Sequence, residues 1–238
     1  MSEHSVAVVT GAGSGIGRAT AVMLGERGYA VVLVGRGREA LRETAELVDS
    51  ETMVLAADIG LEDSAEAVVS GTLDAFGRID ALINNAAMAP MAPLADSGWA
   101  QLAALYRVNA IGPTALIARA WPAMAGQHRA AGTIARIVNV SSMSAIDPFP
   151  GLSSYGATKG ALNVLTRGCA NEGREAGIRA FAVAPGSVET AMLRAIAGED
   201  LVPRTATLTP EQVAGVIVAC AAGERDEENG AVIVVPSA

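Results

Sequence analysis

Tyr155 and Lys159 are the residues best suited to chemistry in this 238-residue sequence. They stand four positions apart in a segment that predicts the start of a helix, so a phenol and an ammonium would share one helical face. Lys159 is the only lysine of the chain, beside sixteen arginines. A tyrosine has an ordinary pKa of about 10, and a neighbouring ammonium lowers that pKa. We therefore predict an acid–base tyrosine; an incidental pair on one helix face is the alternative.

Ser142 is a second candidate, because it follows the strand-like run 137–140 and precedes Tyr155. Open α/β sheets bind their ligands at the carboxyl ends of strands. A hydroxyl there can donate a hydrogen bond to a substrate carbonyl oxygen as that oxygen gains negative charge. Without Tyr155 and Lys159 nearby in the sequence, Ser142 would be interpreted as a loop or cap serine.

The segment 10–17, Thr-Gly-Ala-Gly-Ser-Gly-Ile-Gly, joins a strand-like run to a predicted helix. Gly11, Gly15 and Gly17 let the backbone turn sharply and approach a bulky anion without Cβ clashes. The N-terminus of the helix offers free amide groups and the positive end of its dipole to a pyrophosphate. In this strand–loop–helix context the pattern predicts a dinucleotide site, whereas a glycine-rich loop elsewhere is often only a turn.

The choice of cofactor depends on the end of the next strand, where an acidic side chain would bind a ribose 2′-hydroxyl and repel a 2′-phosphate. This sequence has Gly35 and Arg36 there, with Arg38 close behind. A guanidinium matches phosphate geometry, so the pattern favours NADP(H) over NAD(H). The alternative is a solvated loop arginine in an arginine-rich chain.

The elements that would position these candidate residues are indicated by seven short runs rich in β-branched residues. These runs predict strands over 6–9, 30–34, 52–56, 81–83, 134–140, 179–184 and 231–235. The runs are continuous rather than alternating, which is typical of parallel strands covered on both faces. Helical periodicity lies between them, for example over 15–27, 39–49 and 62–76. The alternation predicts an α/β fold, a doubly wound parallel sheet of Rossmann type with helices on both faces. We find no low-complexity linker and expect a single domain over 1–238.

Composition excludes several other classes of protein. A net charge of −8 argues against nucleic acid or an anionic membrane as a partner, and 51% hydrophobic residues exclude a disordered chain. No apolar stretch approaches the roughly 18 to 20 residues of a membrane span. With two cysteines and two histidines, we expect neither a disulfide framework nor a metal site. These features, with no export signal visible, predict a cytoplasmic protein.

Together these motifs resemble the short-chain dehydrogenase/reductase family over nearly the whole chain. The matching pieces, in the family's order and spacing, are 10–17, Asp58, Asn84-Asn85-Ala86, Asn109, Ser142, Tyr155, Lys159 and 185–190. The resemblance implies a sheet with strand order 3-2-1-4-5-6-7. It also implies an NAD(P)-dependent oxidoreductase that transfers a hydride between the nicotinamide and a ketone or secondary alcohol.

The resemblance implies roles for individual residues. Tyr155 would exchange the proton with the substrate oxygen, Lys159 would bind the nicotinamide ribose, Ser142 would orient the substrate, and Asn109 would hold a water linked to Lys159. Asp58 would meet the adenine ring, and the last of the matching pieces would contact the carboxamide. The implied cofactor-binding set is Gly11, Ser14, Gly15, Ile16, Gly17, Arg36, Asp58, Ile59, Asn85, Ala86, Tyr155, Lys159, Pro185, Gly186, Val188 and Thr190.

The sequence departs from the family pattern in three places that matter for the site. Ser14 stands where many NADP-preferring relatives have a basic residue. Ala87 stands where glycine is usual, so a methyl group replaces a hydrogen beside the cofactor turn. The segment after Thr190 soon reaches Thr209-Pro210, which predicts little chain for a substrate lid. The apolar loop 88–94, with Ile146, Pro148 and Phe149, predicts a mostly hydrophobic pocket for a small molecule.

The substrate class stays open at this point. One alternative is a 3-oxoacyl thioester on an acidic carrier protein, for which Arg129, Arg167 or Arg174 could form a basic entrance. A non-enzymatic dinucleotide sensor on the same fold is another. The family resemblance also implies a homodimer or homotetramer, through helices around 99–125 and 155–176. Small residues at 156, 157, 160, 161 and 168 would allow close approach there or face the sheet.

Overall fold

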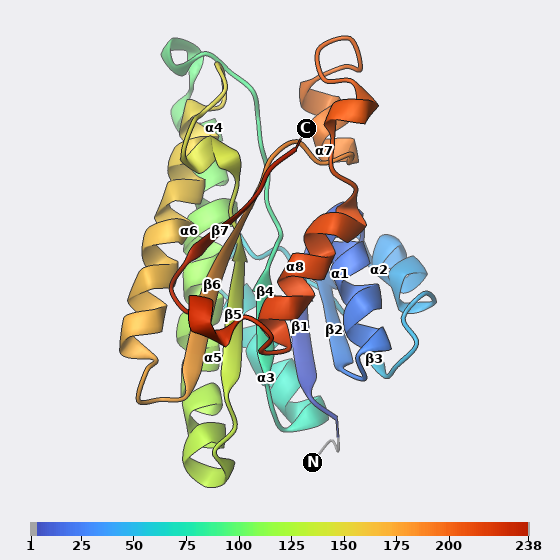
Figure 1. The fold of residues 1–238 in the computed structure, drawn as a ribbon, viewed down its shortest axis with the longest axis vertical. Coiled ribbons are helices and arrows are strands. Elements are labelled where there is room, and N and C mark those ends of the chain that lie inside the picture. The colour runs from blue at the N-terminus through green and yellow to red at the C-terminus, as the bar shows by residue number, and fades with distance from the viewer. Residues whose placement is uncertain (1–3, 238) are drawn as a thin grey trace.

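A computed structural model describes residues 4–237, in which seven parallel strands form one sheet. The strand order is β3-β2-β1-β4-β5-β6-β7 (Figure 1), which confirms the predicted doubly wound α/β fold. The strands are β1 Val6–Thr10, β2 Ala30–Gly35, β3 Thr52–Ala56, β4 Ala81–Asn84, β5 Ala135–Val140, β6 Ile178–Pro185 and β7 Val232–Val235. Every predicted strand is found, and no end differs from its prediction by more than one residue.

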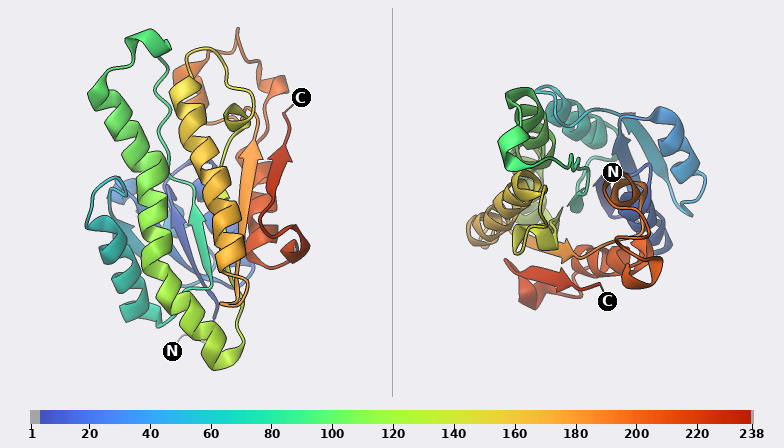
Figure 2. Two further views of the ribbon diagram at one scale, coloured as in Figure 1. Left: turned by 90° about the vertical axis from the view of Figure 1, so that its left-hand side faces the viewer. Right: turned by 90° about the horizontal axis from the view of Figure 1, so that it is seen from above.

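The sheet is buried on both sides because its strand residues alternate between two apolar cores. Val6 and Val8 of β1 belong to one core, whereas Ala7 and Val9 belong to the other. α3 Ser64–Phe76, α5 Gly112–Ala131 and α6 Ser153–Glu172 cover the first face; α1 Gly15–Glu26, α2 Arg38–Ala45 and α8 Pro210–Ala221 cover the second. Figure 2 shows α5 and α6 side by side on the outside of the sheet. Apolar side chains on both faces of each strand explain why the predicted runs are continuous rather than alternating.

Two of the three predicted helices end within two residues of their predictions, and α2 does not. The predicted helix 39–49 stops at Ala45 because the chain turns there, with the Leu47 amide donating to the Thr44 carbonyl. The turn buries Val48 against Gly25 of α1, where an added Cβ would lie only 2.5 Å from Val48 Cγ1. Packing between helices therefore ends α2 earlier than its local pattern predicts.

Two shorter helices complete the part of the fold that surrounds the site. α4 Trp99–Tyr106 and α7 Ala191–Ile196 lie toward the end of the molecule to which the strands point (Figure 1). Between residues 4 and 237, no helix is both long and apolar enough to span a bilayer.

Candidate active site

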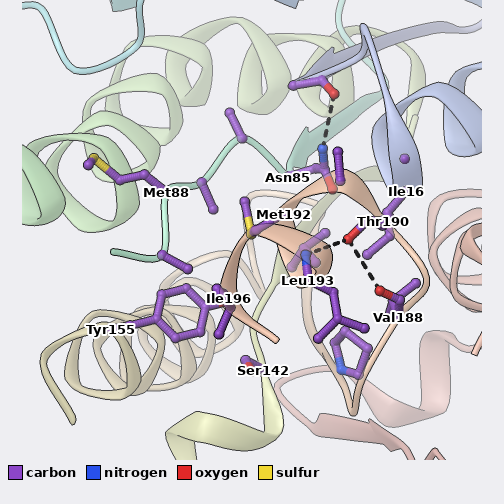
Figure 3. A pocket seen from close by; sticks show the side chains of 18 of the residues that line it. Ile16, Asn85, Met88, Ser142, Tyr155, Val188, Thr190, Met192, Leu193 and Ile196 are labelled. Carbon is purple, nitrogen blue, oxygen red and sulfur yellow. Dashed lines mark hydrogen bonds between the residues drawn. The ribbon is translucent and has the colours of Figure 1, made fainter. Parts of the chain in front are cut away.

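A cavity of about 910 Å³ opens at the carboxyl ends of the strands, and Figure 3 shows the side chains of 18 of the residues that line it. It brings the glycine-rich loop after β1 and the Tyr155 region of α6 into one space. All the predicted catalytic and cofactor-binding residues line this cavity except Gly17 and Asn109. Of the predicted hydrophobic pocket, Met88, Ala89 and Phe149 line it, whereas Ile146, Pro148 and residues 90–94 do not. Sequence patterns 140 residues apart therefore converge on one site.

The glycine-rich loop has the backbone geometry that its sequence predicts. Gly11 has a φ of +67° and Gly15 a φ of +50°, in the left-handed region that favours glycine. Gly17 does not line the cavity, but an added Cβ there would lie 2.2 Å from the Gly11 carbonyl oxygen. Gly17 thus lets the first turn of α1 close against the loop.

Buried hydrogen bonds hold this loop to the neighbouring strand. The Thr10 hydroxyl donates to the Ile83 carbonyl and accepts from the amides of Asn85 and Ala86, each at 3.0 Å. The Asn85 side chain donates to the carbonyls of Thr10, at 2.9 Å, and Gly11. The turn at Asn85 and Ala86, which was predicted to support a cofactor, therefore fixes the glycine-rich loop that was predicted to bind the cofactor's pyrophosphate.

The residues on either side of Asn85 behave differently from one another. Asn84 lies away from the cavity, where its amide donates to the Asn139 side-chain oxygen at 2.9 Å. Ala87 lines the cavity, and no non-glycine residue between 4 and 237 has a positive φ. The methyl group at this usual glycine position is therefore accommodated without backbone strain.

Arg18 is a loop-supporting residue that sequence reasoning missed. Its guanidinium donates to the Gly13 carbonyl at 2.7 Å, to the Thr44 hydroxyl at 3.1 Å and to the Glu43 carboxylate at 3.0 Å. The Thr44 hydroxyl donates in turn to the Ala12 carbonyl. Arg18 thus ties two loop carbonyls to α2. Its position directly after Gly17 was visible in the sequence, but its partners on α2 were not.

The loop and the N-terminus of α1 fit the pyrophosphate of a dinucleotide. The Ser14 side chain makes no cap hydrogen bond, which leaves the first amides of α1 without a side-chain acceptor. Cβ atoms at Gly11 and Gly15 would fill the space beside Asn85 and Thr190. Arg36 lines the same cavity at the end of β2, and Asp58 and Ile59 line it after β3.

The Tyr155 phenol lies in the cavity wall beside Ser142. Desolvation raises the pKa of Tyr155 to about 12, and a hydrogen bond with the Ser142 side chain offsets part of that rise. We predicted a pKa lowered by Lys159; the pKa instead lies above its ordinary value, with burial as the largest cause. Lys159 Nζ lies 5.7 Å from the centre of the Tyr155 ring.

Lys159 is enclosed almost completely, with 2% of its surface exposed. Its ammonium donates to the Val140 carbonyl at 2.6 Å, at the carboxyl end of β5. Burial lowers the pKa of Lys159 to about 8, because the charged form loses its hydration. The Ser141 hydroxyl donates to the Lys159 carbonyl, which fixes this turn of α6 to the strand.

Asn109 lies behind the cavity in a π-helical turn, Arg107–Ile111, between α4 and α5. Its side-chain oxygen accepts from the Met88 amide at 2.9 Å, and its NH₂ donates to the Met88 carbonyl and the Thr158 hydroxyl. Asn109 thus joins the loop after β4 to the helix that carries Tyr155. That it holds a water linked to Lys159 stays a prediction. Thr158, inside the Tyr155–Lys159 spacing, is a second residue that we missed.

Residues 187–208, hereafter the cap, line the part of the cavity that the glycine-rich loop and the Tyr155 region leave open. Backbone hydrogen bonds close its base, from the Leu208 amide to the Ser187 carbonyl and from the Glu189 amide to the Leu208 carbonyl. Figure 3 shows Met192 and Ile196 of α7 among the side chains that line the cavity with Tyr155. The cap lines the cavity with Ser187, Val188, Thr190, Ala191, Met192, Leu193, Ile196, Ala197, Leu201 and Val202. The segment predicted to leave little chain for a lid is short, and its residues nevertheless line the cavity through a short helix and a turn.

Ion pairs hold the cap together. Arg194 donates to both oxygens of the Glu189 carboxylate and to the Val202 carbonyl at 2.8 Å. Arg204 pairs with Glu189 at 3.5 Å and with Glu199 at 2.8 Å. The guanidinium of Arg194 holds the pKa of Glu189 below its ordinary value, mainly through their hydrogen bond. The cap is thus closed mainly by contacts among its own residues.

The basic entrance considered for an acidic carrier protein is absent from the described cavity lining. None of Arg129, Arg167 and Arg174 lines the cavity. Arg129 lies near the end of α5, shortly before β5 begins, and Arg174 lies between α6 and β6. Helices of a parallel sheet run back against the strands, so both arginines lie at the opposite edge. Arg167 is twelve residues along α6 from Tyr155, or about 18 Å toward that edge.

Comparison with known proteins gives one family. The family described as short chain dehydrogenase matches residues 5–200. A short chain dehydrogenase/reductase from Aspergillus oryzae is 32% identical over 253 aligned positions, covering 99% of this chain and 94% of that protein.

Two solved structures share the whole fold. A 3-ketoacyl-(acyl-carrier-protein) reductase from Brucella melitensis, complexed with NADH, superposes with a TM-score of 0.92 at 28% identity, covering 98% of this chain and 96% of that one. Levodione reductase superposes with a TM-score of 0.88 at 28% identity, with the same coverage. The two neighbours are named for different substrates.

Proposed function

The chain belongs to the short-chain dehydrogenase family, and on that premise we propose that it transfers a hydride between NADP(H) and a ketone or secondary alcohol. The family makes it an NAD(P)-dependent dehydrogenase or reductase acting on a small molecule; the substrate, the cofactor preference and the residue roles are our proposals. One observation carries them: Tyr155, Lys159 and Ser142 line the same cavity as the glycine-rich loop. We also propose that residues 1–238 act as one NAD(P)-binding domain.

The protein's own groups would orient the substrate and handle the proton. A bound nicotinamide supplies or accepts the hydride. In reduction, the Tyr155 phenol donates its proton to the carbonyl oxygen; in oxidation, Tyr155 removes the alcohol proton. The Ser142 hydroxyl donates to the same oxygen as it gains negative charge. Lys159, held by the Val140 carbonyl, presents its remaining donors to the ribose and stabilises the tyrosinate by its charge.

Cofactor preference rests on the end of β2. Arg36 lines the cavity there, between Gly35 and Gly37, and no acidic residue lies among these neighbours. A guanidinium pairs with a ribose 2′-phosphate, which supports NADP(H) over NAD(H). Calorimetric dissociation constants for NADPH and NADH test the preference. Equal or tighter binding of NADH would contradict it.

A 3-oxoacyl-thioester reductase is the second candidate, favoured by the name of the Brucella melitensis neighbour. The position of the three arginines considered for a basic entrance weighs against it, since Arg129, Arg167 and Arg174 lie away from the cavity. A non-enzymatic sensor has no observation of its own in its favour, and family membership weighs against it. We therefore place the small ketone or alcohol first.

We propose self-association, as a homodimer or homotetramer, through the outer face of α5 and α6. Gly160 and Gly168 have open space where a Cβ would lie, and Ala161 and Val164 are exposed beside them. Gly156 does not belong to this face, because it packs against the Ser144 carbonyl. A small-residue helix face allows close approach of a second copy. Light scattering after size-exclusion chromatography tests the proposal, and a monomer would contradict it.

The proton role is tested with Tyr155→Phe, which removes the hydroxyl and keeps the ring. We expect kcat/KM for a reduced ketone to fall by about a hundred-fold to ten-thousand-fold. The dissociation constant for NADPH, measured by fluorescence, should change less than about two-fold, because the glycine-rich loop is untouched.

Tyr106→Phe is the matched control, because Tyr106 is an exposed tyrosine of α4 outside the cavity. It should retain wild-type rates. Activity of Tyr155→Phe within a few-fold of wild type would overturn the assignment of Tyr155. The panel should include ketones, 3-oxoacyl thioesters and quinones, each with NADPH and NADH, so that the second candidate is measured in the same assay.

A further inference from the structure

Asp147 is a charged side chain in the cavity that the proposed reaction does not use. Within the part of the chain that the structure describes, the charged residues lining the cavity are Arg36, Asp58, Asp147 and Lys159. Arg36 and Asp58 follow β2 and β3, in the half proposed for the cofactor. Lys159 is enclosed and donates to the Val140 carbonyl. Asp147 is therefore the exposed charge that the substrate half presents.

The turn that carries Asp147 packs against the helix that carries Tyr155. The Asp147 amide donates to the Met143 carbonyl at 2.9 Å, just after Ser142 in the chain. An added Cβ at Gly156 would lie 2.2 Å from the Ser144 carbonyl oxygen and 3.3 Å from Pro148 Cβ. Only a glycine at 156 permits this approach. The close packing holds residues 144–148 beside the first turn of α6, and with them the Asp147 carboxylate.

The charge of Asp147 is not neutralised within residues 4–237. Its carboxylate makes no hydrogen bond or ion pair there. The nearby cap cations are engaged elsewhere, since Arg194 and Arg204 both pair with Glu189. Arg36 follows β2, which is three strands from β5, the strand that precedes the turn carrying Asp147, and it forms no ion pair with Asp147.

Apart from hydroxyl groups such as those of Ser142 and Tyr155, the other side chains of the substrate half are mainly apolar. Met88, Phe149, Met192 and Ile196 line it, together with the other apolar residues of the cap. These groups offer an anionic substrate neither a cation nor hydrogen-bond donors, and they reduce the water available to hydrate it. An uncharged apolar molecule loses nothing by entering the same space.

We propose that Asp147 is a specificity-determining residue that selects against anionic substrates, so that the protein acts on uncharged, mainly apolar ketones or alcohols. The proposal rests on the proposed function and sharpens it. Asp147 would favour neutral ketones over two kinds of anionic substrate: carboxylates, and acyl thioesters that carry a phosphate group. Repulsion by a fixed charge costs the disfavoured substrate affinity without any steric change.

The first test compares two substrates with the same reacting carbonyl, ethyl acetoacetate and acetoacetate. Wild type should favour the ester in kcat/KM. Asp147→Asn should reduce that preference by about three-fold to ten-fold, as expected for one partly screened charge, and Asp147→Lys should reduce it further. Asp74→Asn is the matched control: it makes the same charge change on the exposed surface of α3, outside the cavity, and should leave the preference unchanged.

A second measurement needs no turnover. Isothermal calorimetry compares the inert pair cyclohexanecarboxamide and cyclohexanecarboxylate on wild type and Asp147→Asn. We expect the variant to strengthen carboxylate binding several-fold and to leave amide binding unchanged. An unchanged ester preference together with unchanged carboxylate binding would overturn the role of Asp147, while ester turnover by wild type would keep the proposed function. Stronger carboxylate binding without turnover of any ketone would support Asp147 and contradict the function.

Discussion

The two halves of the cavity are held together by different kinds of interaction. In the cofactor half, the buried Thr10 hydroxyl and the Asn85 amide hold the glycine-rich loop to β4 through hydrogen bonds to backbone groups. In the substrate half, partly exposed ion pairs among Glu189, Arg194 and Arg204 hold the cap. Thr10 is fully buried, although its hydrogen bonds with Asn85 and Ala86 are only partly buried. The side chains of Arg194, Glu189 and Arg204 are 19%, 24% and 62% exposed.

This difference has consequences for rigidity. The fully buried Thr10 hydroxyl is costly to leave without partners, so the loop has few alternatives to its native geometry. Ion pairs that reach water contribute less and are screened by salt, so a segment that depends on them opens at lower cost. A pyrophosphate is the same in every dinucleotide, whereas substrates differ. We infer that the cofactor half is preorganised and that the substrate half is adjustable.

The largest effect should come from breaking the cofactor half at Gly17. In Gly17→Ala the new Cβ would lie 2.2 Å from the Gly11 carbonyl oxygen, so the loop or the first turn of α1 must move. We expect NADPH affinity to fall by about a hundred-fold or more, because the amides that face the pyrophosphate lose their positions. Calorimetry measures the dissociation constant, and circular dichroism checks that the fold survives.

Gly126→Ala is the control for that experiment. Gly126 is also helical, in α5, and the atom nearest to an added Cβ lies 3.8 Å away. It should bind NADPH as wild type does and gain about 0.5 to 1 kcal/mol of stability from the better helix former. If Gly17→Ala kept wild-type affinity, the loop would be adjustable too, and the contrast between the halves would disappear.

The cofactor half was also the half that sequence predicted best. Its pattern is local: glycines at fixed spacing between a strand and a helix report backbone geometry directly. The strands were equally local, because β-branched runs buried on both faces differ from everything around them. The contacts that hold the loop could not be predicted, because Arg18 and Thr44 come together only when the chain folds. No sequence pattern at Thr44 indicates that it accepts a hydrogen bond from Arg18.

The substrate half resisted prediction because its features depend on tertiary packing. The cap is held by Arg194 and Glu189, five residues apart in a segment whose length predicted little chain for a lid. The pKa of Tyr155 was predicted in the wrong direction, because spacing shows that Lys159 is near but not how deeply both are buried. Asp147 had no motif at all. The burial of a side chain and the charges around it depend on residues that are distant in the sequence, so they can be determined only from the folded structure.

Lys159, where the two halves meet, gives a prediction of intermediate size. Its pKa is lowered from 10.5 to about 8 in the folded protein, so between these values the unfolded chain binds a proton that the folded protein does not. Stability contributed by this residue therefore rises with pH across that window, and the penalty of the buried charge is fully present below it. Tyr155, whose pKa is raised from 10 to about 12, opposes this only above pH 10.

Urea unfolding of wild type and Lys159→Met measures the effect. Between pH 7 and 9.5 the free energy of unfolding of wild type should rise relative to the variant by an amount on the order of 2 kcal/mol. A difference between the two proteins that stayed constant with pH would mean that Lys159 is hydrated. In that case the boundary between the halves would be as open as the cap.

The smallest effect should come from loosening the cap at Arg194. In Arg194→Gln the ion pair with Glu189 is lost, and the contact with the Val202 carbonyl is weakened. We expect KM for a ketone to rise about three-fold to ten-fold with kcat little changed, because the cap would enclose the substrate but takes no part in the proposed proton transfer. The KM of Arg194→Lys should lie between those of wild type and Arg194→Gln, since an ammonium cannot reproduce the paired contacts of a guanidinium.

Two further readouts separate an adjustable cap from general damage. Limited proteolysis should cut Arg194→Gln faster within residues 197–204, while its NADPH affinity stays at the wild-type value because the glycine-rich loop is held independently. Arg119→Gln removes an exposed ion pair to Glu66, between α5 and α3, and should change neither property. A parallel loss of NADPH affinity in Arg194→Gln would show that the halves are coupled, because Thr190 of the cap lies beside Gly15. Unchanged KM and unchanged proteolysis would instead mean that the base of the cap, from Ser187 to Leu208, suffices to hold it.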